Sequence, residues 1–408
     1  MMLKNRIDFE KIIYFSVLVF AFTLPLSRAA ISFFALFLPF LWLLEGGFKT
    51  KYQQIKSNKT LLSIVALSLL TLVSILWSAN TEIALKHIRL NSYFFVIFVI
   101  ATSIKKEQVQ NIISSFLLGM FISEVIAYGV FFELWTFKHA TVQNPSPFMM
   151  HIDYSVFMAF TSILLLNRIF ASRYELKEKL VFFLFFLTVT GNLFLAIGRT
   201  GQAAFIVAVF VMSIIHYRVG IKSVLMSFLV LFVIFASAYN FSDTFKLRAN
   251  AGIKDIHGIS KMDFNSSWGI RVAYYITSYD IIKHNPLVGV GAGDYKNETI
   301  KVLKDKKYEF LSQETRDFMA EYHPHSQYLL ILLQMGIVGL AVFLYMIYQI
   351  LSLKIKNPEI KELSILFCVI FFVSSFAEPL FSKQFTIALF ILFVGLFNIE
   401  TSSSNSNQ

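Results

Sequence analysis

Residues 323–340 read HPHSQYLLILLQMGIVGL, and the interpretation of the whole chain depends on them. Two histidines, His323 and His325, stand directly before an apolar run that continues past Gly336. A long polar segment ends at the same point. Both imidazoles are therefore expected at the mouth of a membrane helix, facing the largest piece of chain outside the lipid. Gly336 and Gly339 are interpreted as close-packing positions within that helix.

The composition of the whole chain indicates a polytopic, all-α membrane protein. The chain has 408 residues, of which 56% are hydrophobic and only 15% are charged. Soluble domains carry about 25% charged residues. Apolar runs of the length that crosses a hydrocarbon core as a helix, about 20 residues, recur along most of the sequence.

Hydropathy predicts about 12 membrane-spanning helices. The predicted spans cover residues 12–27, 30–46, 61–78, 91–104, 108–133, 151–169, 180–198, 200–216, 223–241, 326–350, 363–381 and 385–399. The first apolar run is interpreted as an uncleaved helix and not as a signal peptide. The chain is thus divided into helices 1–9 (1–241), a large, partly helical periplasmic loop (242–325), helices 10–12 (326–400) and a polar cytoplasmic tail (401–408).

The net charge of +11 is explained by the short loops between the apolar runs. The basic loops are 49–59, 105–106, 173–179, 218–222 and 354–361. When successive loops are assigned to alternate sides of the membrane, all of these basic loops fall on the same side as the N-terminus, as the positive-inside rule requires. Both termini are therefore predicted to be cytoplasmic, and no nucleic acid partner is expected. The single cysteine, Cys368, lies in an apolar run and offers neither a disulfide nor a thiolate metal cluster.

The large loop contains a predicted helix and a glycine-rich turn. Apolar spacing favours a helix over 268–284, with Arg271 in its first turn and Asn285-Pro286 at its end. The turn that follows, GVGAGD at 289–294, is either a plain flexible turn or a set of backbone N–H groups that approach a phosphate. The plain turn is favoured, because no strand precedes the glycines. Residues 296–321 are charged and are expected to be partly helical with a solvated face.

Taken together, these motifs resemble the O-antigen ligase and polymerase superfamily of bacterial envelopes. The resemblance rests on the helix that carries Arg271, on NPLVGVGAG at 285–293, and on ten residues between His325 and Gly336, as in the family's H(X10)G pattern. The layout of twelve spans with one large, late periplasmic loop also fits. One motif departs: the ligase R(X3)L pattern is not met at Arg199 or Arg271.

The resemblance implies an activity and a location. Members transfer a polysaccharide from an undecaprenyl pyrophosphate carrier to an acceptor at the periplasmic face of the inner membrane. The ligases use a sugar hydroxyl of lipid A-core and need neither metal nor cofactor. Carried over, His325 is the catalytic base, and Arg199 and Arg271 bind the pyrophosphate. The implied partners are the carrier-linked glycan donor, the lipid A-core acceptor and membrane lipid.

Physical chemistry supports these roles without the resemblance. A neutral imidazole accepts a hydroxyl proton near neutral pH. Guanidinium groups keep their charge and match phosphate oxygens in a bidentate geometry. Simpler alternatives exist: His325 as a helix-start residue bonded to backbone, and Arg199 as a helix-end residue that snorkels to the interface. Glycines on both sides of Arg199 favour the close approach of a headgroup.

Other charged residues are weaker candidates. His323 is expected to support the loop. Arg28, Lys86 and Arg89 are interpreted as ordinary loop charges on the side where an anionic carrier lipid needs them. Glu378 and Glu124 lie within or beside apolar runs, where carboxylates are costly and often functional. The arginines are their expected partners.

Alternative functions remain within and outside the superfamily. The first is an O-antigen polymerase or a protein O-oligosaccharyltransferase, although the latter usually carries a longer C-terminal region. The second is a polytopic transporter or lipid flippase. A transporter is expected to contain two similar halves with broken helices near the midplane, and the sequence contains no such repeat.

Overall fold

The computed structural model describes residues 8–217, 220–241 and 243–401, and 78% of the chain is helical. The described residues contain no strand, which confirms the all-α prediction. Among the described residues, eight helices are long and apolar enough to cross a membrane. The predicted number of twelve spans stays a prediction. The tail from 402 to 408 and residues 218–219 of one basic loop lie outside the described residues.

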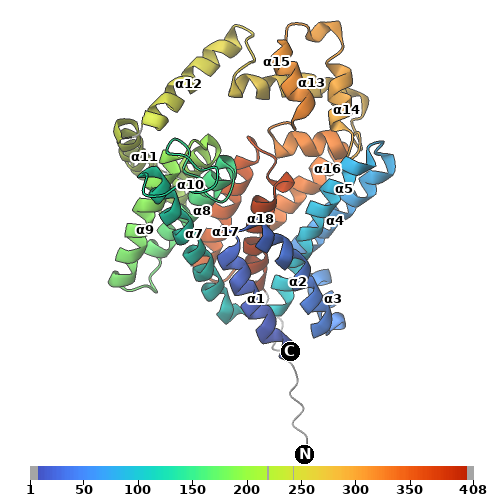
Figure 1. Cartoon of the computed structure of the whole chain (residues 1–408). Coiled ribbons are helices and arrows are strands. Elements are labelled where there is room, and N and C mark those ends of the chain that lie inside the picture. Colours follow the sequence, from blue (N-terminus) through green and yellow to red (C-terminus); the bar gives the residue numbers. More distant parts are fainter. Residues whose placement is uncertain (1–7, 218–219, 242, 402–408) are drawn as a thin grey trace, which may run out of the picture.

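Most helices form one bundle (Figure 1). Short 3₁₀ turns join several of them, among them η1 (Ser74–Trp77), η2 (Ser92–Phe94) and η5 (Leu380–Ser382). The bundle helices are α1 (Phe9–Thr23), α2 (Arg28–Glu45), α3 (Phe48–Ser57), α4 (Lys59–Val73), α5 (Thr81–Asn91), α6 (Phe95–Ser103), α7 (Val109–Phe131), α8 (His151–Phe170), α9 (Leu176–Leu195), α10 (Arg199–Tyr217), α11 (Ile221–Phe241), α16 (Gln327–Leu351), α17 (Pro358–Ser374) and α18 (Gln384–Ile399).

The centre of the bundle is formed by helices that are apolar on all faces. Every residue of α18 from Phe385 to Ile399 is buried, and most of α8 is buried as well. A helix that is hydrophobic all round is stable only when neighbours cover every face. Phenylalanine rings fill the space between these helices; for example, Phe160 and Phe393 pack edge to face with their centroids 4.5 Å apart.

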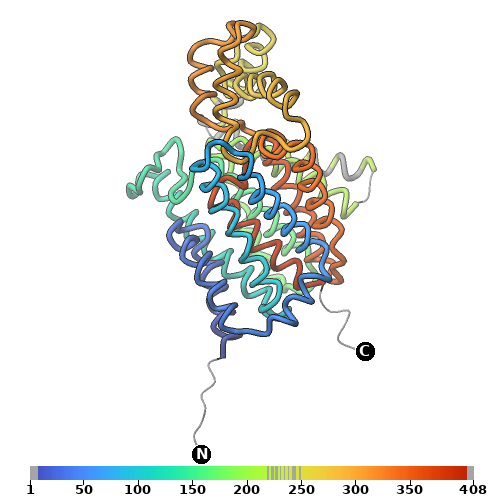
Figure 2. The backbone as a smooth tube through the Cα atoms, turned by 90° about the vertical axis from the view of Figure 1, so that its right-hand side faces the viewer, coloured from blue at the N-terminus to red at the C-terminus, as the bar shows by residue number. Residues whose placement is uncertain are grey.

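The segment between α11 and α16 forms a helical cap on one end of the bundle. The cap helices are α12 (Asp243–Ser260), α13 (Ser267–His284), α14 (Tyr295–Val302) and α15 (Gln313–Glu321). Figures 1 and 2 show the cap at the end opposite the start of α1 and the end of α18. Its own apolar core includes Tyr274, Met319 and, from the bundle, Leu330 and Leu333. The helix predicted at 268–284 is confirmed within one residue.

α16 is broken at Gly336, which contradicts the expectation of a continuous helix. Gly336 has φ +62° and ψ −162°, a conformation that disfavours a side chain. An added Cβ would lie 2.3 Å from the backbone of Leu287. The break divides α16 into a first part, 327–335, and a second part that begins at Ile337. Gly336 is therefore a close-packing position as expected, against the backbone of Leu287, but it lies at a break and not inside a regular helix.

The glycine-rich turn is docked into this break. Val290 and Gly291 donate their backbone N–H groups to the carbonyls of Leu333 and Gln334, at 2.9 Å each. In return, the amides of Ile337 and Val338 donate to Pro286 and Leu287. These amides serve the fold. The phosphate-binding interpretation of the turn is therefore not supported at Val290 and Gly291.

One predicted boundary is wrong in a way that affects the candidate residues. The fourth span was expected to begin at 91, but a continuous helical segment already begins at Thr81 and includes α5, η2 and α6. Lys86 and Arg89 therefore lie on a helix and not in a loop. Asn80 caps this helix by accepting the N–H of Ile83, a signal of a helix start that the charged residues obscured.

Candidate functional site

His325 stands two residues before α16, in a turn that is fixed on both sides. Ser326 is the N-cap of α16, and its hydroxyl accepts the N–H of Leu329 at 3.3 Å. The amide of Gln327 donates to the carbonyl of Ser375, which follows the end of α17. These bonds place His325 beside the connection between α17 and α18.

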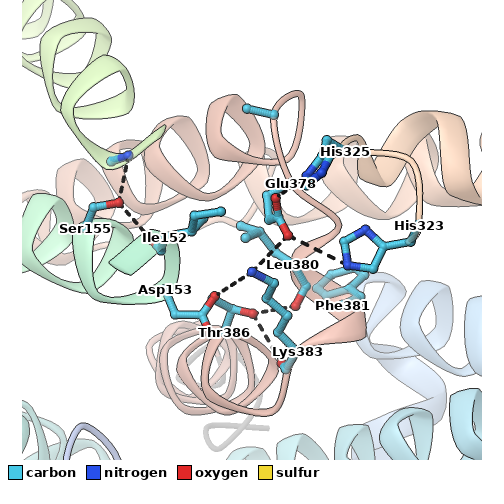
Figure 3. A network of polar contacts seen from close by, with 12 residues as sticks. Ile152, Asp153, Ser155, His323, His325, Glu378, Leu380, Phe381, Lys383 and Thr386 are labelled. Carbon is cyan, nitrogen blue, oxygen red and sulfur yellow. Dashed lines mark hydrogen bonds and ion pairs between the residues drawn. The ribbon is translucent and has the colours of Figure 1, made fainter. Parts of the chain in front are cut away.

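That connection presents Glu378 to the histidine (Figure 3). The Nδ1 atom of His325 lies 2.9 Å from Oε2 of Glu378. The other carboxylate oxygen, Oε1, lies 2.8 Å from the ammonium group of Lys383. Lys383 also forms an ion pair with Asp153 of α8, at 3.2 Å. A buried chain of charges, His325–Glu378–Lys383–Asp153, thus joins the two helix connections to the bundle.

The surroundings of Glu378 keep it ionised. Burial by itself raises a carboxyl pKa, but the hydrogen bond to His325 and the charge of Lys383 outweigh burial and bring the pKa of Glu378 to about 2. Burial likewise opposes the charge of Lys383, yet Asp153 and Glu378 raise the pKa of that ammonium group above its usual value. Glu378 is therefore a carboxylate throughout the physiological range, and its partner at Nδ1 must donate a proton.

His323 lies at the edge of the same chain of charges. Its Nε2 atom is 3.9 Å from Oε1 of Glu378, too far for a hydrogen bond. Its buried Nδ1 atom has no hydrogen-bond partner within the described chain. Burial lowers the pKa of His323, and Glu378 opposes this shift only in part. His323 is thus a neutral neighbour of the site at pH 7.

The cap contributes an aromatic wall and a guanidinium group. The ring of Phe318 from α15 stacks on His325 with their centroids 6.0 Å apart, and Tyr274 from α13 stands edge-on at 6.4 Å. Arg271, in the first turn of α13, donates to the carbonyl of Ala377 at 3.4 Å. That carbonyl immediately precedes Glu378. The predicted Arg271 is therefore brought next to His325 by the closure of the cap on the bundle.

Arg271 retains unused hydrogen-bonding capacity. Its Nε atom is buried and has no partner within the described chain. Burial lowers the pKa of this guanidinium group, Glu378 raises it, and the nearby charge of Arg199 lowers it. An arginine remains charged despite such a shift. A guanidinium group with an unused N–H group can still donate a hydrogen bond to an anion.

Arg199 lies at the start of α10, near Arg271. Its Nη1 atom is 3.6 Å from the carboxylate of Asp255 in α12, an ion pair without a hydrogen bond. Gly201 packs directly on Ser155 of α8, where a Cβ would meet the backbone at 2.1 Å. The amide of Gly201 also donates to the Ser155 hydroxyl. Gly201 therefore has a packing role, in addition to any close approach of a headgroup to Arg199 that it permits.

The remaining candidates fall into two groups. Arg28 lies near the chain of charges: its guanidinium stands 5.5 Å over the ring of Phe385, and its carbonyl accepts from Gln384, the residue after Lys383. Lys86 instead forms an exposed i,i+4 pair with Glu82 at 2.8 Å. Arg89 is exposed on the same helix, α5. Lys86 and Arg89 are not brought into the network around Glu378.

The expected pairing of the buried carboxylates with arginines is wrong. Glu378 pairs with His325 and Lys383. Glu124 accepts a hydrogen bond from the hydroxyl of Thr188 in α9 at 2.7 Å. In both cases the carboxylate pairs with the residue that lies nearest in space. That residue cannot be predicted from hydropathy, because hydropathy does not give the order of the helices around the bundle.

Sequence reasoning missed three members of the site: Lys383, Asp153 and Asp255. The first two carried a usable signal, because Asp153 lies inside a predicted span and Lys383 lies between the last two spans. Ionisable residues in such positions are expensive and are usually paired. Asp255 carried no signal, since it lies in a charged segment whose helix α12 was not predicted.

One group of side chains has the composition of a metal site. Ligand atoms of His323, His325 and Glu378 lie within 4.8 Å of one another. However, the ammonium group of Lys383 already lies at hydrogen-bond distance from Oε1 of Glu378. A cation at this carboxylate is therefore supplied by the chain itself, and the residues fit an ion pair better than a metal ion.

Comparison with known proteins found a family resemblance over part of the chain. No curated protein matched the chain. The family model described as O-antigen ligase matches residues 183–344, about two fifths of the chain. The match includes Arg199, Arg271 and His325, and it ends before Glu378 and Lys383. Residues 183–344 of this helical membrane protein are therefore similar to the O-antigen ligase family.

Proposed function

We propose that the protein is a glycosyltransferase of the O-antigen ligase type, with His325 as its catalytic base. In this reaction a polysaccharide moves from undecaprenyl pyrophosphate to a sugar hydroxyl of lipid A-core. The family match supports a glycan transfer enzyme of this superfamily. The observation that carries the specific proposal is the 2.9 Å contact between Nδ1 of His325 and the ionised Glu378.

This contact determines which nitrogen of His325 is basic. Because Glu378 is a carboxylate, Nδ1 carries the proton and donates it to Oε2. The lone pair of Nε2 is then free to accept a proton. A carboxylate behind an imidazole also stabilises the imidazolium that forms during the reaction. His325 is thus oriented with Nε2 free to accept a proton, as a general base requires.

The proposed step is a displacement at the anomeric carbon of the donor glycan. The acceptor oxygen forms a bond to that carbon while its proton moves to Nε2 of His325. The bond between the anomeric carbon and the pyrophosphate oxygen breaks, and the electron pair leaves with the pyrophosphate. Arg199 and Arg271 hold the leaving group, whose negative charge increases as the bond breaks. The imidazolium later returns its proton to water.

We further propose that the cap and the site face the periplasm and that both termini are cytoplasmic. The ion pairs of Lys105 with Glu10 and of Lys106 with Glu400 support this orientation, because they place one basic loop beside the ends of α1 and α18. Those ends lie opposite the cap (Figure 2). Basic loops at one end of the bundle are typical of the cytoplasmic side. The membrane is then the bacterial inner membrane.

A test uses lipopolysaccharide from a strain that lacks the gene and carries either the wild-type or a variant copy. His325→Ala is expected to abolish attachment of polymer to lipid A-core and to leave unligated, carrier-linked polymer. General-base catalysis is worth about 10²–10⁴-fold, so the residual rate is below detection on a gel. His323→Ala, the matched control, is expected to retain ligation. Capped lipopolysaccharide in the His325→Ala strain would show that the base is another group.

The same gel separates the two activities of the superfamily. In a polymerase, loss of His325 shortens the polymer and leaves caps of a single repeat on lipid A-core. In a ligase, the polymer keeps its length and remains on the carrier. Caps of one repeat would therefore replace the ligase proposal by the polymerase.

A further inference from the structure

A pocket on the cap side of the bundle lies apart from the charged site around Glu378. It has a volume of about 580 Å³ and is formed where η1 and the start of α5 meet the glycine-rich turn and α14. Its wall includes the ring of Trp77 and the side chains of Asn285, Asn297 and Lys301. None of these residues takes part in the reaction proposed above. Starting from that proposed function, we infer that the pocket binds the saccharide part of the acceptor.

The polar groups of this pocket favour a neutral, hydroxyl-rich ligand. The charges are already matched: Lys301 pairs with Glu298 at 2.5 Å, and both oxygens of Asp294 accept backbone N–H groups, from Ala79 and Asn80. No uncommitted cation remains on this wall for a phosphate. A lipid headgroup that is recognised through its phosphate therefore fits poorly.

The uncharged groups, by contrast, are free to bind. The amide of Asn297 makes no hydrogen bond within the described chain, and that of Asn285 makes only a long one, 3.5 Å, to the carbonyl of Ile281. The indole N–H of Trp77 lacks a partner among the described residues but is buried, so Trp77 contributes the face of its ring to the pocket. Amides and an indole combine donors and acceptors with a flat apolar face. Sugar rings present hydroxyls at their rims and C–H groups on their faces, which matches this wall.

The position relative to His325 suits the acceptor rather than the donor. The pocket wall at Gly289 and Val290 is bonded to the first part of α16 at Leu333. At roughly 1.5 Å of rise per residue, the six helical steps from Gln327, the first residue of α16, to Leu333 correspond to about 9 Å, and His325 lies two residues before Gln327. A short oligosaccharide spans this length. The backbone bonds between the turn and α16 keep the pocket at a fixed distance from the base.

The two sides of His325 are also distinct. In Figure 1, α10 and α12, which carry Arg199 and Asp255, stand on one side of the start of α16, and α5 and α14 stand on the other. In a single displacement, the incoming and leaving oxygens lie on opposite sides of the anomeric carbon. With the pyrophosphate at the arginines, the acceptor approaches from the side of α5 and α14.

The test measures initial transfer rates of the full-length protein in nanodiscs, with the oligosaccharide released from lipid A-core as acceptor. Trp77→Ala is expected to raise the acceptor KM about tenfold and Asn297→Ala about threefold, with kcat and the donor KM unchanged. Trp135→Ala, which removes an exposed tryptophan that follows α7 and does not line this pocket, is the matched control and leaves the acceptor KM unchanged. Thermal melting of each variant establishes that it is folded.

An unchanged acceptor KM in folded Trp77→Ala protein would overturn the inference, as would a rise in the donor KM alone. A second measurement does not depend on catalysis. Saturation-transfer NMR on the His325→Ala protein is expected to detect the same oligosaccharide, and the signal is lost when Trp77→Ala is added. If the wild-type protein transfers no glycan, the proposed function fails, and the NMR result decides the pocket by itself. Retention of the signal in the double variant would reject the pocket.

Discussion

The two halves of the candidate site differ in how completely their charges are matched. On the side of His325, Glu378 has a partner at each oxygen, and Lys383 is shared between two carboxylates. On the side of the arginines, Arg199 has one long ion pair, and both Arg199 and Arg271 keep buried nitrogen atoms without a hydrogen bond. The ion pairs of the first half are 2.8–3.2 Å long, whereas the one ion pair of the second half is 3.6 Å long.

This difference fits the two tasks of a glycan transfer. A general base must already have the correct tautomer when the acceptor arrives, so its surroundings are fixed in advance. A leaving-group site must release its product, and a fully satisfied anion would leave slowly. The first half is therefore expected to tolerate substitution poorly. The second half is expected to respond to substitution through substrate affinity.

The strongest test of this contrast is Lys383→Met. The change leaves Glu378 and Asp153 buried without their cation, and breaking a buried pair in this way costs about 3–5 kcal/mol. We expect a loss of stability of that size and loss of transfer activity, because Glu378 becomes easier to protonate and no longer fixes Nδ1 of His325. Chemical denaturation and the transfer rate measure the two effects.

Lys383→Arg keeps the charge and is expected to recover much of the stability. Lys86→Met, which removes an exposed lysine from α5, is the matched control and changes stability by less than about 0.5 kcal/mol. If Lys383→Met is as stable as Lys86→Met, the chain of charges is not the support that we infer.

An intermediate effect is expected from the arginine half. Arg271→Lys and Arg199→Lys keep the charge but lose the bidentate geometry, so the donor KM should rise about tenfold with little change in stability. Steady-state rates at varied donor concentration provide the measurement. Arg89→Ala serves as the comparison, since this exposed arginine lies away from the network. A donor KM that is equal in all three variants would remove the pyrophosphate role from Arg199 and Arg271.

The smallest effect concerns acid pH. The pKa of Glu378 is about 2 in the folded protein, below its usual value of 4.5. A depressed carboxyl pKa contributes stability above pH 4.5, and this contribution is lost as the pH falls from 4.5 toward 2. The melting temperature of the wild type should therefore fall more steeply over this range than that of Glu378→Gln. Parallel curves would mean that Glu378 is not held ionised by its neighbours.

The positions of the bundle helices were predictable where apolar runs mark them. The apolar runs identified α8 and α10, and Ser266 and Asn285 bound the helix with Arg271 as the apolar spacing indicated. The start of α5 was missed, because Lys86 and Arg89 make its first turns polar. The break at Gly336 was also missed, since a glycine in an apolar run does not reveal the sign of its φ angle.

The site was predictable only in its separate parts. His325, Arg199 and Arg271 were identified by motif and chemistry, and the structure brings all three to the boundary between cap and bundle. Glu378 was named as a candidate, but its pairing with His325 was not predicted, and neither were Lys383 and Asp153. The connection between α17 and α18 carries Glu378 and Lys383, and α8 carries Asp153; how these elements are arranged around the bundle is absent from the sequence. Spacing along one helix predicts neighbours, whereas contacts between helices depend on packing.

The break in α16 has a consequence for how the protein is assembled. A helix that breaks near lipid leaves carbonyl and amide groups without partners, at a cost of several kcal/mol for each unsatisfied group. Here four of these groups are satisfied by residues 286–291, which belong to the cap. The cap is consequently an inseparable part of the membrane domain: it cannot be deleted or exchanged as a module.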